Sequence, residues 1–267
     1  MDTPLISVIL ATYNGSRFLW EAIESVLYQD YNNLELIVID DSSTDIEVWN
    51  ILERYKKEDS RISSYRNEKN MERSYSKNLW VTKALWEYIA FIDDDDIWHA
   101  RKLSKQMISL QKDINLAIIW THARFIDEWG KILWETNHLK INPKDISENI
   151  LFTNQFIHSS VVLKKEVFLS VWGFSMAMNL CEDYDLWLRI LTSSFGANIW
   201  EPLVNYRVRA MSTTAHNIYR MKYYSLLLTW KYRKNFPWFL QAFWLRIILF
   251  PIPTVFIMKV WNRLFHK

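Results

Sequence analysis

Residues 5–45 read LISVILATYNGSRFLWEAIESVLYQDYNNLELIVIDDSSTD. Two short apolar runs, LISVIL at 5–10 and LELIVI at 34–39, are typical of buried strands. Between them, apolar residues from Phe18 to Leu27 recur at helical spacing. A polar cluster follows each run, Thr12-Tyr13-Asn14 after the first and Asp40-Asp41 after the second. The stretch therefore predicts two strands of one sheet joined by a crossover helix.

The same alternation continues through residue 110. We expect helices over 46–55, over about 74–85, and from after Asp96 through Leu110. A third strand is expected over 88–92 (YIAFI), and it ends in four consecutive aspartates, Asp93 to Asp96. This order predicts an α/β fold with a mainly parallel, Rossmann-like sheet flanked by helices. Ligands bind at the carboxyl ends of such strands, so the three polar clusters are expected to form one site.

The aspartate run is hard to explain by structure alone, because neighbouring carboxylates repel one another and raise each other's pKa. A hard divalent cation that bridges to phosphate oxygens, Mg²⁺ or Mn²⁺, removes that cost. The alternative is a solvated turn in which Asp96 caps the following helix. Asp41 and Ser43 carry the same ambiguity as caps of the helix over 46–55, because a carboxylate at a strand end can instead bind a base or a ribose.

A third acidic cluster, Glu182-Asp183-Tyr184-Asp185, precedes an apolar helical run over 186–191. Acidic residues in a first helical turn commonly complement the helix dipole. A carboxylate at this place can also serve as a general base for an attacking hydroxyl. Spacing alone favours the dipole interpretation.

The C-terminal segment differs in charge from the rest of the chain. All 30 Asp and Glu lie at or before Glu201, whereas 11 of the 32 Lys and Arg follow it. The longest charge-free apolar run in this segment, 247–258, has 12 residues and is interrupted by Pro251 and Pro253. A membrane-spanning helix needs about 20 residues. We therefore predict an α/β domain over 1–215 and a basic, aromatic helical tail over 216–267 that contacts an anionic membrane surface.

Two alternatives for the tail stay open, a helical hairpin packed on the α/β domain and a dimer surface. Nucleic acid is not expected as a partner, because aromatic and aliphatic residues outnumber basic ones in the tail. Cys181 is the single cysteine, so a disulfide within the chain is excluded, and the N-terminal residues do not resemble a secretory signal. We expect a cytoplasmic protein, peripheral on the inner face of the cell membrane.

Several segments in this order resemble the family 2 glycosyltransferases, which have the GT-A fold. They cover roughly residues 5–215 and read SVILATYNGSRFLWEAIESVLYQDYNNLELIVIDDSSTD, NEKN, RSYSKN, YIAFIDDDDIWHARKLSKQ, FIHSSVVLKKEVFLSVWGF, EDYDLWLRI and PLVNYRVR. The resemblance implies an inverting enzyme that moves a sugar from a nucleotide-diphosphate sugar, foremost a UDP-sugar, to an acceptor hydroxyl. The acceptor would be a glycan or a lipid-linked molecule in cell-surface polysaccharide or glycolipid synthesis. The implied cofactor is Mn²⁺ or Mg²⁺.

Two other functions remain as alternatives, a nucleotidyltransferase on a similar fold and a non-catalytic sugar- or metal-binding protein. The first usually has a Gly-rich phosphate loop after its first strand, and ATYNGSRF is a poor match to one. The second is disfavoured because Asp95 and Asp183 occur together.

The resemblance also assigns roles to residues. Asp41 would contact the base, Asp93 would lie nearer the ribose, and Asp95 would be the principal metal ligand with Asp93 beside it. Asp183 would be the catalytic base. The implied nucleotide-sugar site comprises Thr12, Tyr13, Asn14, Asp41, Asn78, Asp93 and Asp94. The implied sugar or acceptor site comprises Trp98, His158 and Glu182. A lone His such as His158 can instead be a core residue, and Arg209 stands where the family often has a His, which leaves a third metal ligand open.

The chain has 15 Trp and only 4 Gly, where about 19 Gly would be usual. Trp80, Trp86 and Trp172 stand where the family usually has Gly, and Trp86 is expected at a helix end that favours a left-handed residue. We hypothesise that the source reads UGA as glycine, so that these tryptophans are translation artefacts. The alternative is a protein that is rich in Trp by nature.

Overall fold

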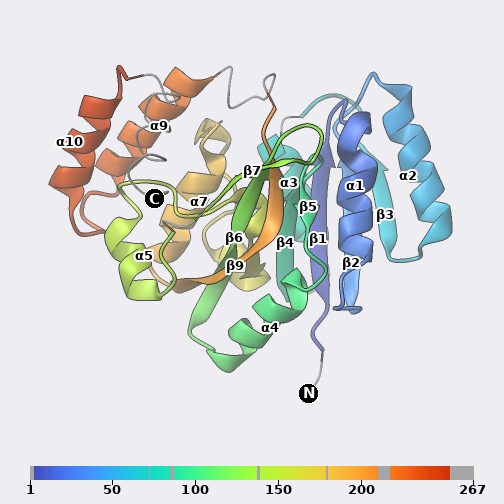
Figure 1. The fold of residues 1–267 in the computed structure, drawn as a ribbon, viewed down its shortest axis with the longest axis horizontal. Coiled ribbons are helices and arrows are strands. Elements are labelled where there is room, and N and C mark those ends of the chain that lie inside the picture. The colour runs from blue at the N-terminus through green and yellow to red at the C-terminus, as the bar shows by residue number, and fades with distance from the viewer. Residues whose placement is uncertain are drawn as a thin grey trace.

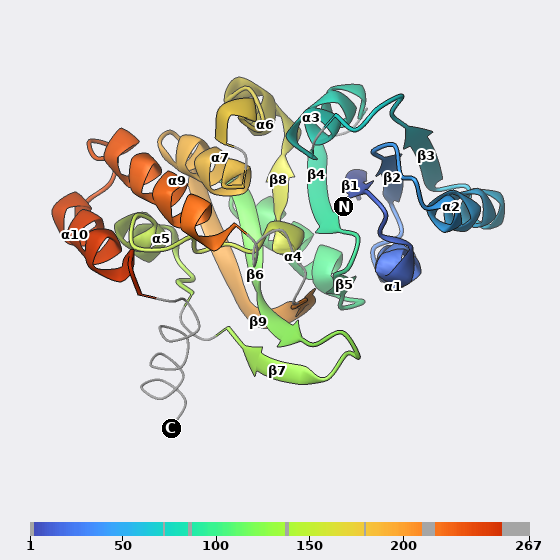
Figure 2. The ribbon, with the colours of Figure 1, turned by 90° about the horizontal axis from the view of Figure 1, so that it is seen from above.

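The computed structural model describes residues 3–71, 73–84, 87–136, 139–178, 180–209 and 217–252. These residues form a mixed nine-stranded sheet with the strand order β3-β2-β1-β4-β8-β6-β9-β5 and with β7 paired to β6. Helices cover both faces of this sheet (Figures 1 and 2). The expected α/β class is confirmed, although the sheet is parallel chiefly in its N-terminal half.

The N-terminal half contains the three strands expected from the sequence and one more. Strand β1 pairs in parallel with β2 and β4, and β2 pairs in parallel with β3. In this register Thr12 lies opposite Asp40, and Ala11 lies opposite Asp93, so the polar clusters meet at one edge of the sheet. The elements are β1 (Ile6–Thr12), α1 (Ser16–Leu27), β2 (Leu34–Asp40), α2 (Ile46–Glu58), β3 (Ile62–Arg66), α3 (Arg73–Lys83) and β4 (Tyr88–Asp93).

The C-terminal half extends the sheet with antiparallel and parallel pairs. Strand β8 pairs antiparallel with β4 and β6, and β9 runs parallel to β6. The elements are β5 (Ile97–Trp98), α4 (Lys102–Lys112), β6 (Leu116–Ile126), β7 (Ile132–Glu135), α5 (Pro143–Asn149), the short 3₁₀ turn η1 (His158–Ser160), β8 (Val162–Lys164), α6 (Lys165–Ser170), η2 (Met176–Met178), α7 (Glu182–Leu191), β9 (Phe195–Arg207), α9 (Ile218–Lys231) and α10 (Phe239–Leu249).

The apolar core has two parts, one on each face of the sheet. On one face, α1, α2 and α4 bury side chains such as Leu19, Leu52 and Leu103 against the strands. On the other face, α3, α6 and α7 do the same, with Trp187 of α7 fully buried. Because alternate side chains of a strand point to opposite faces, the buried strands read as continuous apolar runs in the sequence.

Two helix starts differ from the sequence-based expectation. Helix α2 begins after Asp45, whose side chain accepts a hydrogen bond from the backbone N–H of Glu47, so neither Asp41 nor Ser43 caps it. The helix expected directly after Asp96 begins instead at Lys102. Residues 97–98 form β5 on β9, a pairing with residues more than 100 positions later that local periodicity cannot reveal.

The tail forms a hairpin of α9 and α10 at the opposite end of the molecule from α2 (Figure 1). Leu228, Tyr232, Phe236 and Ala242 are buried in the same core cluster as Trp187, so 217–252 pack on the α/β body as one of the two alternatives stated. Within the described ranges, no helix is both long and apolar enough to cross a membrane. The boundary at 215/216 and half of the apolar run 247–258, residues 253–258, lie outside the described residues, and the two-part division stays a proposal.

The tryptophans fall into different environments. Trp172 has φ 66° and is 91% exposed, and Trp238 has φ 61°, a left-handed backbone that a bulky residue rarely adopts. Trp80 is buried within α3 and stacks on Tyr65 at a ring-centroid distance of 3.6 Å. Trp86 lies outside the described residues. The backbone therefore favours glycine at 172 and 238, while Trp80 is packed as a core side chain.

Candidate active site

The loop after β1 is tied to the loop after β2. The side-chain oxygen of Asn14, Oδ1, accepts hydrogen bonds from the backbone N–H groups of Thr44 and Asp45, at 2.8 and 3.0 Å. The Thr12 hydroxyl donates to Asp94 Oδ2 at 2.5 Å, which joins this loop to the end of β4. A Cβ at Gly15 would lie 2.0 Å from the same Asp94 oxygen, so glycine is needed there for this approach. Tyr13 is half-exposed at this edge.

Asp41 is buried and held in one orientation. Its Oδ1 accepts hydrogen bonds from Asn67 Nδ2 at 2.6 Å, the Met71 backbone N–H at 3.0 Å and the Ser76 hydroxyl at 3.1 Å. Asn67 and Met71 lie between β3 and α3, and Ser76 lies in α3, so the Asp41 carboxylate is oriented by contacts outside the sheet.

Asp93, at the end of β4, lies beside two basic groups. Its Oδ1 is 3.4 Å from Lys77 Nζ and 4.0 Å from His158 Nε2, and the two nitrogens are 2.6 Å apart. Lys77 is almost fully buried, and the His158 ring stacks on Phe91. His158 thus combines a packed ring with a polar contact in the site. The sequence analysis missed Lys77, and the signal that could have found it is the basic residue before Asn78 in RSYSKN.

The last two aspartates of the run, Asp95 and Asp96, contact residues at and just after the end of β9. Asp95 Oδ2 forms an ion pair with Arg209 Nε at 2.6 Å. Asp96 is fully buried, and it accepts hydrogen bonds from the Ser159 hydroxyl at 2.5 Å and the Arg207 backbone N–H at 2.9 Å. Burial raises the pKa of Asp96 well above its usual value, and the charges of Asp95 and Asp93 raise it further. Asp96 therefore anchors the loop from behind and is not a helix cap.

A hard divalent cation fits the donor chemistry of this loop, because Asp93, Asp94 and Asp95 all present carboxylate oxygens. No group of three His, Cys, Asp or Glu side chains suited to a metal is found in the part of the chain that the structure describes. Mg²⁺ commonly takes one or two carboxylates and completes its shell with substrate phosphates and water, so a third protein ligand is not required. Arg209 already pairs with Asp95, and a bound cation would have to share or displace that contact.

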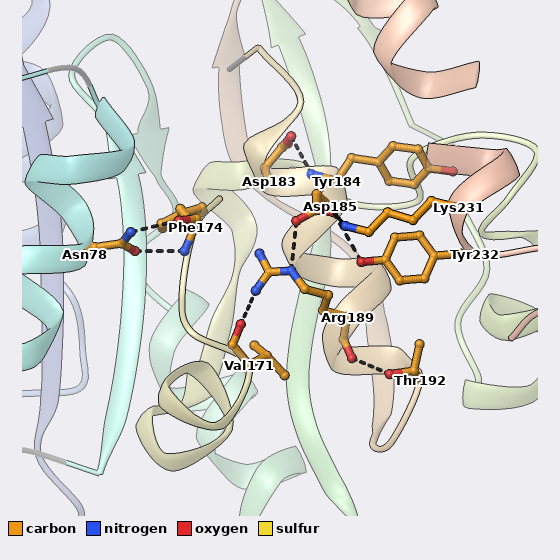
Figure 3. Close-up of polar contacts among 10 residues, drawn as sticks. All are labelled: Asn78, Val171, Phe174, Asp183, Tyr184, Asp185, Arg189, Thr192, Lys231 and Tyr232. Atoms are coloured by element: carbon orange, nitrogen blue, oxygen red, sulfur yellow. Dashed lines mark hydrogen bonds and ion pairs between the residues drawn. The ribbon is translucent and has the colours of Figure 1, made fainter. Parts of the chain in front are cut away.

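Asp183 lies in the first turn of α7 (Figure 3). Its Oδ1 accepts the Tyr184 backbone N–H at 2.6 Å, and its Oδ2 accepts Asn154 Nδ2 at 3.3 Å. Burial raises the pKa of Asp183 to about 7, and the charges of Glu182 and Asp93 add to the rise. The Tyr184 hydrogen bond and the charge of Lys77 oppose it. The charges of Asp93 and Lys77 thus act on the pKa of Asp183, although Asp93 and Asp183 are 90 positions apart in the sequence.

Two expected site residues, Asn78 and Trp98, have hydrogen-bond partners within the protein. The Asn78 amide donates to the Phe174 backbone carbonyl and accepts from its N–H, both at 2.8 Å (Figure 3). Trp98 is buried, its Nε1 donates to the Ser159 carbonyl at 2.7 Å, and the Lys102 ammonium lies 3.7 Å from its ring centroid. Both side chains hold segments that carry site residues. Glu182 is half-buried beside Asp183, and its role at the sugar or acceptor stays a prediction.

Comparison with known proteins agrees with this fold and these motifs. The family model "Glycosyl transferase family 2" matches residues 7–172. An uncharacterized glycosyltransferase of Methanocaldococcus jannaschii is 31% identical over 271 residues, covering 97% of this chain and 93% of the relative. The Escherichia coli enzyme WfgD, a UDP-Glc:alpha-D-GlcNAc-diphosphoundecaprenol beta-1,3-glucosyltransferase, is 34% identical over 191 residues, covering 72% and 71%.

A solved structure extends the likeness to the fold. A mannosyltransferase of Pyrobaculum calidifontis in complex with GDP-Man and Mn²⁺ superimposes with a TM-score of 0.67 at 17% identity, covering 94% of this chain and 71% of that one. The nucleotidyltransferase and non-catalytic alternatives are set aside by these matches. The chain belongs to glycosyl transferase family 2 and is a glycosyltransferase of the GT-A fold.

Proposed function

We propose that this enzyme transfers a sugar from a nucleotide-diphosphate sugar, foremost a UDP-sugar, to a hydroxyl of a lipid-linked glycan at an anionic membrane surface. The observation that carries the proposal is the rim of strand ends, where Thr12 bonds Asp94 and Lys77 contacts Asp93, together with Asp183 in the first turn of α7, whose pKa burial raises to about 7. A base with a pKa near the working pH and a charged strand-end rim are the two parts that such a transfer needs.

The donor would bind across the strand-end loops. Thr12, Tyr13 and Asn14 would line the nucleotide pocket. Asp41, locked by three donors on one oxygen, would present its carboxylate to the base. These loops are tied to one another by Asn14 and by the Thr12–Asp94 hydrogen bond, which supports a preformed pocket.

The diphosphate would lie against the end of β4. Asp93 and Asp95 would hold Mn²⁺ or Mg²⁺, which when bound supplies positive charge to the leaving diphosphate. Lys77 and Arg209 add two fixed cations beside the same carboxylates, and a buried cation stabilises developing negative charge more strongly than an exposed one.

Asp183 would take the proton from the acceptor hydroxyl while that oxygen attacks the anomeric carbon from the face opposite the diphosphate. Attack from that face inverts the configuration at the carbon. Glu182 and His158 would border the sugar or the acceptor, since they lie next to Asp183 and Asp93 respectively.

A lipid-linked acceptor is supported by WfgD, whose name specifies a diphosphoundecaprenol-linked sugar, and by the outer surface of the hairpin. Exposed apolar residues recur at helical spacing on both of its helices, and acidic residues are absent after Glu201. An apolar stripe among basic residues is complementary to anionic lipid. The exposed apolar residues are Tyr219, Tyr223, Leu227, Trp230, Leu240, Trp244, Leu245 and Ile248.

The activity is tested with the full chain, Mn²⁺ or Mg²⁺, a panel of nucleotide-sugars and a lipid-diphosphate-linked N-acetylglucosamine acceptor. We expect nucleoside diphosphate release that depends on the acceptor, that is lost in Asp183→Asn, and that is kept in Glu135→Gln, which alters an exposed carboxylate. Release that ignores both the acceptor and Asp183→Asn would overturn the proposal.

The membrane contact is tested by sedimentation with anionic vesicles. Deleting the hairpin would expose the core around Leu228 and Tyr232 and so affect folding as well as binding. Point substitutions of exposed residues change the surface alone. Leu240→Ser with Ile248→Ser should weaken binding, and high salt should weaken it in the parent protein. The matched control, Ile108→Ser with Ile114→Ser, alters equally exposed residues in and just after α4 and should bind normally. A parent chain that never sediments with these vesicles would contradict this part.

A further inference from the structure

A single buried carboxylate joins the helix of the proposed base to the C-terminal hairpin (Figure 3). Asp185, two residues after Asp183, is fully buried. Its Oδ2 accepts a hydrogen bond from Arg189 Nε at 2.8 Å, one turn later in α7. Its Oδ1 accepts from Lys231 Nζ at 2.8 Å, at the end of α9, and from the Tyr232 hydroxyl at 3.2 Å. The two oxygens thus face different elements.

The residues on either side of Asp183 make further contacts with the hairpin. The Tyr184 hydroxyl donates to the Ile150 carbonyl at 2.5 Å and accepts from Arg246 Nη2 of α10 at 2.9 Å. The Cys181 thiol, at the N-terminal end of α7, lies 3.6 Å from a backbone carbonyl of α9. The first turn of α7 is therefore held from outside by both hairpin helices.

Such contacts are better suited to fixing geometry than to adding stability. Burying a carboxylate costs several kcal/mol in general, and two cationic partners roughly offset that cost. Removing one partner leaves a buried charge only partly compensated, and the helix can relieve this by moving. Asp183 is in the first turn of α7, where a shift of the helix moves it directly. A misplacement of about 1 Å in a reacting group can reduce a rate about 100-fold.

We propose that Lys231, with Tyr232, is a positioning residue that holds α7 so that Asp183 faces the acceptor hydroxyl. The C-terminal hairpin is then part of the catalytic apparatus as well as the membrane-facing surface. The exposed apolar residues and the contacts with α7 lie on the same hairpin, so a movement of the hairpin would reach the base helix through Asp185 and through Tyr184 and Cys181. The proposal rests on the role of Asp183 given above, but it does not depend on which sugar is transferred.

The test compares Lys231→Met, Lys231→Arg and Lys234→Met. Lys231→Met removes the ammonium and keeps the length of the side chain, whereas Lys231→Arg retains a cation. Lys234→Met makes the same charge change at an exposed residue three positions later. Two readouts are taken, amide hydrogen exchange of the peptide over 182–191 and the steady-state constants for the donor with the lipid-linked acceptor.

Lys231→Met should speed exchange over 182–191, leave exchange of the β1, β2 and β4 peptides unchanged, and lower kcat about 10- to 100-fold. The KM of the donor should stay within about twofold, since the strand-end loops are untouched. Lys231→Arg should restore most of kcat, and Lys234→Met should match the parent in both readouts. Exchange in Lys231→Met equal to that in Lys234→Met would overturn the proposal, as would faster exchange with unchanged kcat. If the parent chain were inactive with every donor, the proposed function would fail, while the exchange result would still decide whether Lys231 holds α7.

Discussion

The donor rim and the base helix are built in different ways. The rim consists of the strand-end loops 12–16, 40–45 and 93–96, and parallel pairing places them, since Thr12 lies opposite Asp40 and Ala11 opposite Asp93. The base helix α7 is packed through buried side chains such as Trp187, and its first turn is also held by side chains that come from α9 and α10. Backbone register brings the rim loops together and side-chain hydrogen bonds such as Thr12–Asp94 tie them, whereas the position of the base depends on α7 packing and on a few polar contacts with the hairpin. A single substitution should disturb the second region much more easily than the first.

One turn, residues 171–174, connects the two regions (Figure 3). On the rim side, the Asn78 amide of α3 makes two hydrogen bonds to the backbone of Phe174. On the other side, Arg189 of α7 donates to the Val171 carbonyl. Arg189 also pairs with Asp185, so the turn, the base helix and the hairpin share one set of polar contacts.

The largest expected effect comes from Asp183→Asn, which keeps the size of the side chain and removes its basicity. Turnover should fall on the order of 10²- to 10⁴-fold, because general base catalysis contributes about that much. Nucleotide affinity should be nearly unchanged, since the rim does not involve Asp183. Steady-state kinetics and direct titration with nucleotide measure the two quantities.

Asp185→Asn makes the same chemical change two residues later in α7, so its effects are compared with those of Asp183→Asn. It should lower the free energy of unfolding on the order of 3 kcal/mol, because Arg189 and Lys231 lose a buried partner. Asp183→Asn should leave the denaturation midpoint close to that of the parent. Near-normal turnover in Asp183→Asn would show that Asp183 is not the base. A greater loss of turnover in a folded Asp185→Asn than in Asp183→Asn would show the same.

A smaller but still large effect is expected at the rim. Asp95→Ala should lower kcat about 10²- to 10³-fold, since the diphosphate loses the carboxylate proposed to hold its counter-charge. EDTA should produce a loss of similar size in the parent enzyme, whereas Glu135→Ala should change nothing. Full activity in EDTA would remove the divalent cation from the mechanism and would leave Lys77 and Arg209 as the cations of the rim.

The sequence predicted the rim well because its signals are local. An apolar run that stops at polar residues marks a strand end, and β1, β2 and β4 are present within two residues of their expected ends. Parallel pairing then brings Asp41 and Asp93 to the same edge. The resemblance to family 2 supplied the order of these motifs, and the family match and the GT-A fold are confirmed.

The sequence could not predict the supports of the base helix. Asp185 and Lys231 are 46 positions apart, Asn78 and Phe174 are 96 apart, and β5 pairs with β9 across more than 100 positions. No local periodicity encodes such contacts. This is why the hydrogen bonds of Asn78 and Trp98 to the protein backbone could not be expected from the sequence.

The pH dependence of kcat/KM for the acceptor gives a graded measure of the base. A pKa of about 7 in the free enzyme means that Asp183 is ionised and competent above that pH and protonated below it. At low acceptor concentration, kcat/KM should therefore fall on the acid side of about pH 7, by about tenfold per pH unit, because this constant reports the free enzyme. This acid-side fall should be absent from the residual activity of Asp183→Asn. A kcat/KM that stays constant down to pH 5 would show that Asp183 is not held in the environment described.

The smallest expected effect concerns the turn that joins the two regions. Trp172 adopts φ 66° and is 91% exposed, so its ring contributes little burial while its backbone is strained. Trp172→Gly should raise the free energy of unfolding by about 1 kcal/mol, since a left-handed conformation costs a non-glycine residue about 1 to 2 kcal/mol. Trp80→Gly should do the reverse and cost about 3 to 5 kcal/mol, because that ring is buried on Tyr65.

Equilibrium denaturation measures both changes, and mass spectrometry of the protein from its native source tests the codon hypothesis directly. A native mass that fits Trp at 80, 86 and 172 would end the hypothesis of glycine in the native chain. A destabilised Trp172→Gly would show that the ring at 172 makes a contact that outweighs the strain of its backbone. If Trp172→Gly is more stable and its donor KM and kcat match the parent, the turn connects the rim to the base helix through its backbone hydrogen bonds. The side chain at 172 would then be dispensable, as it must be if the native chain has glycine at this position.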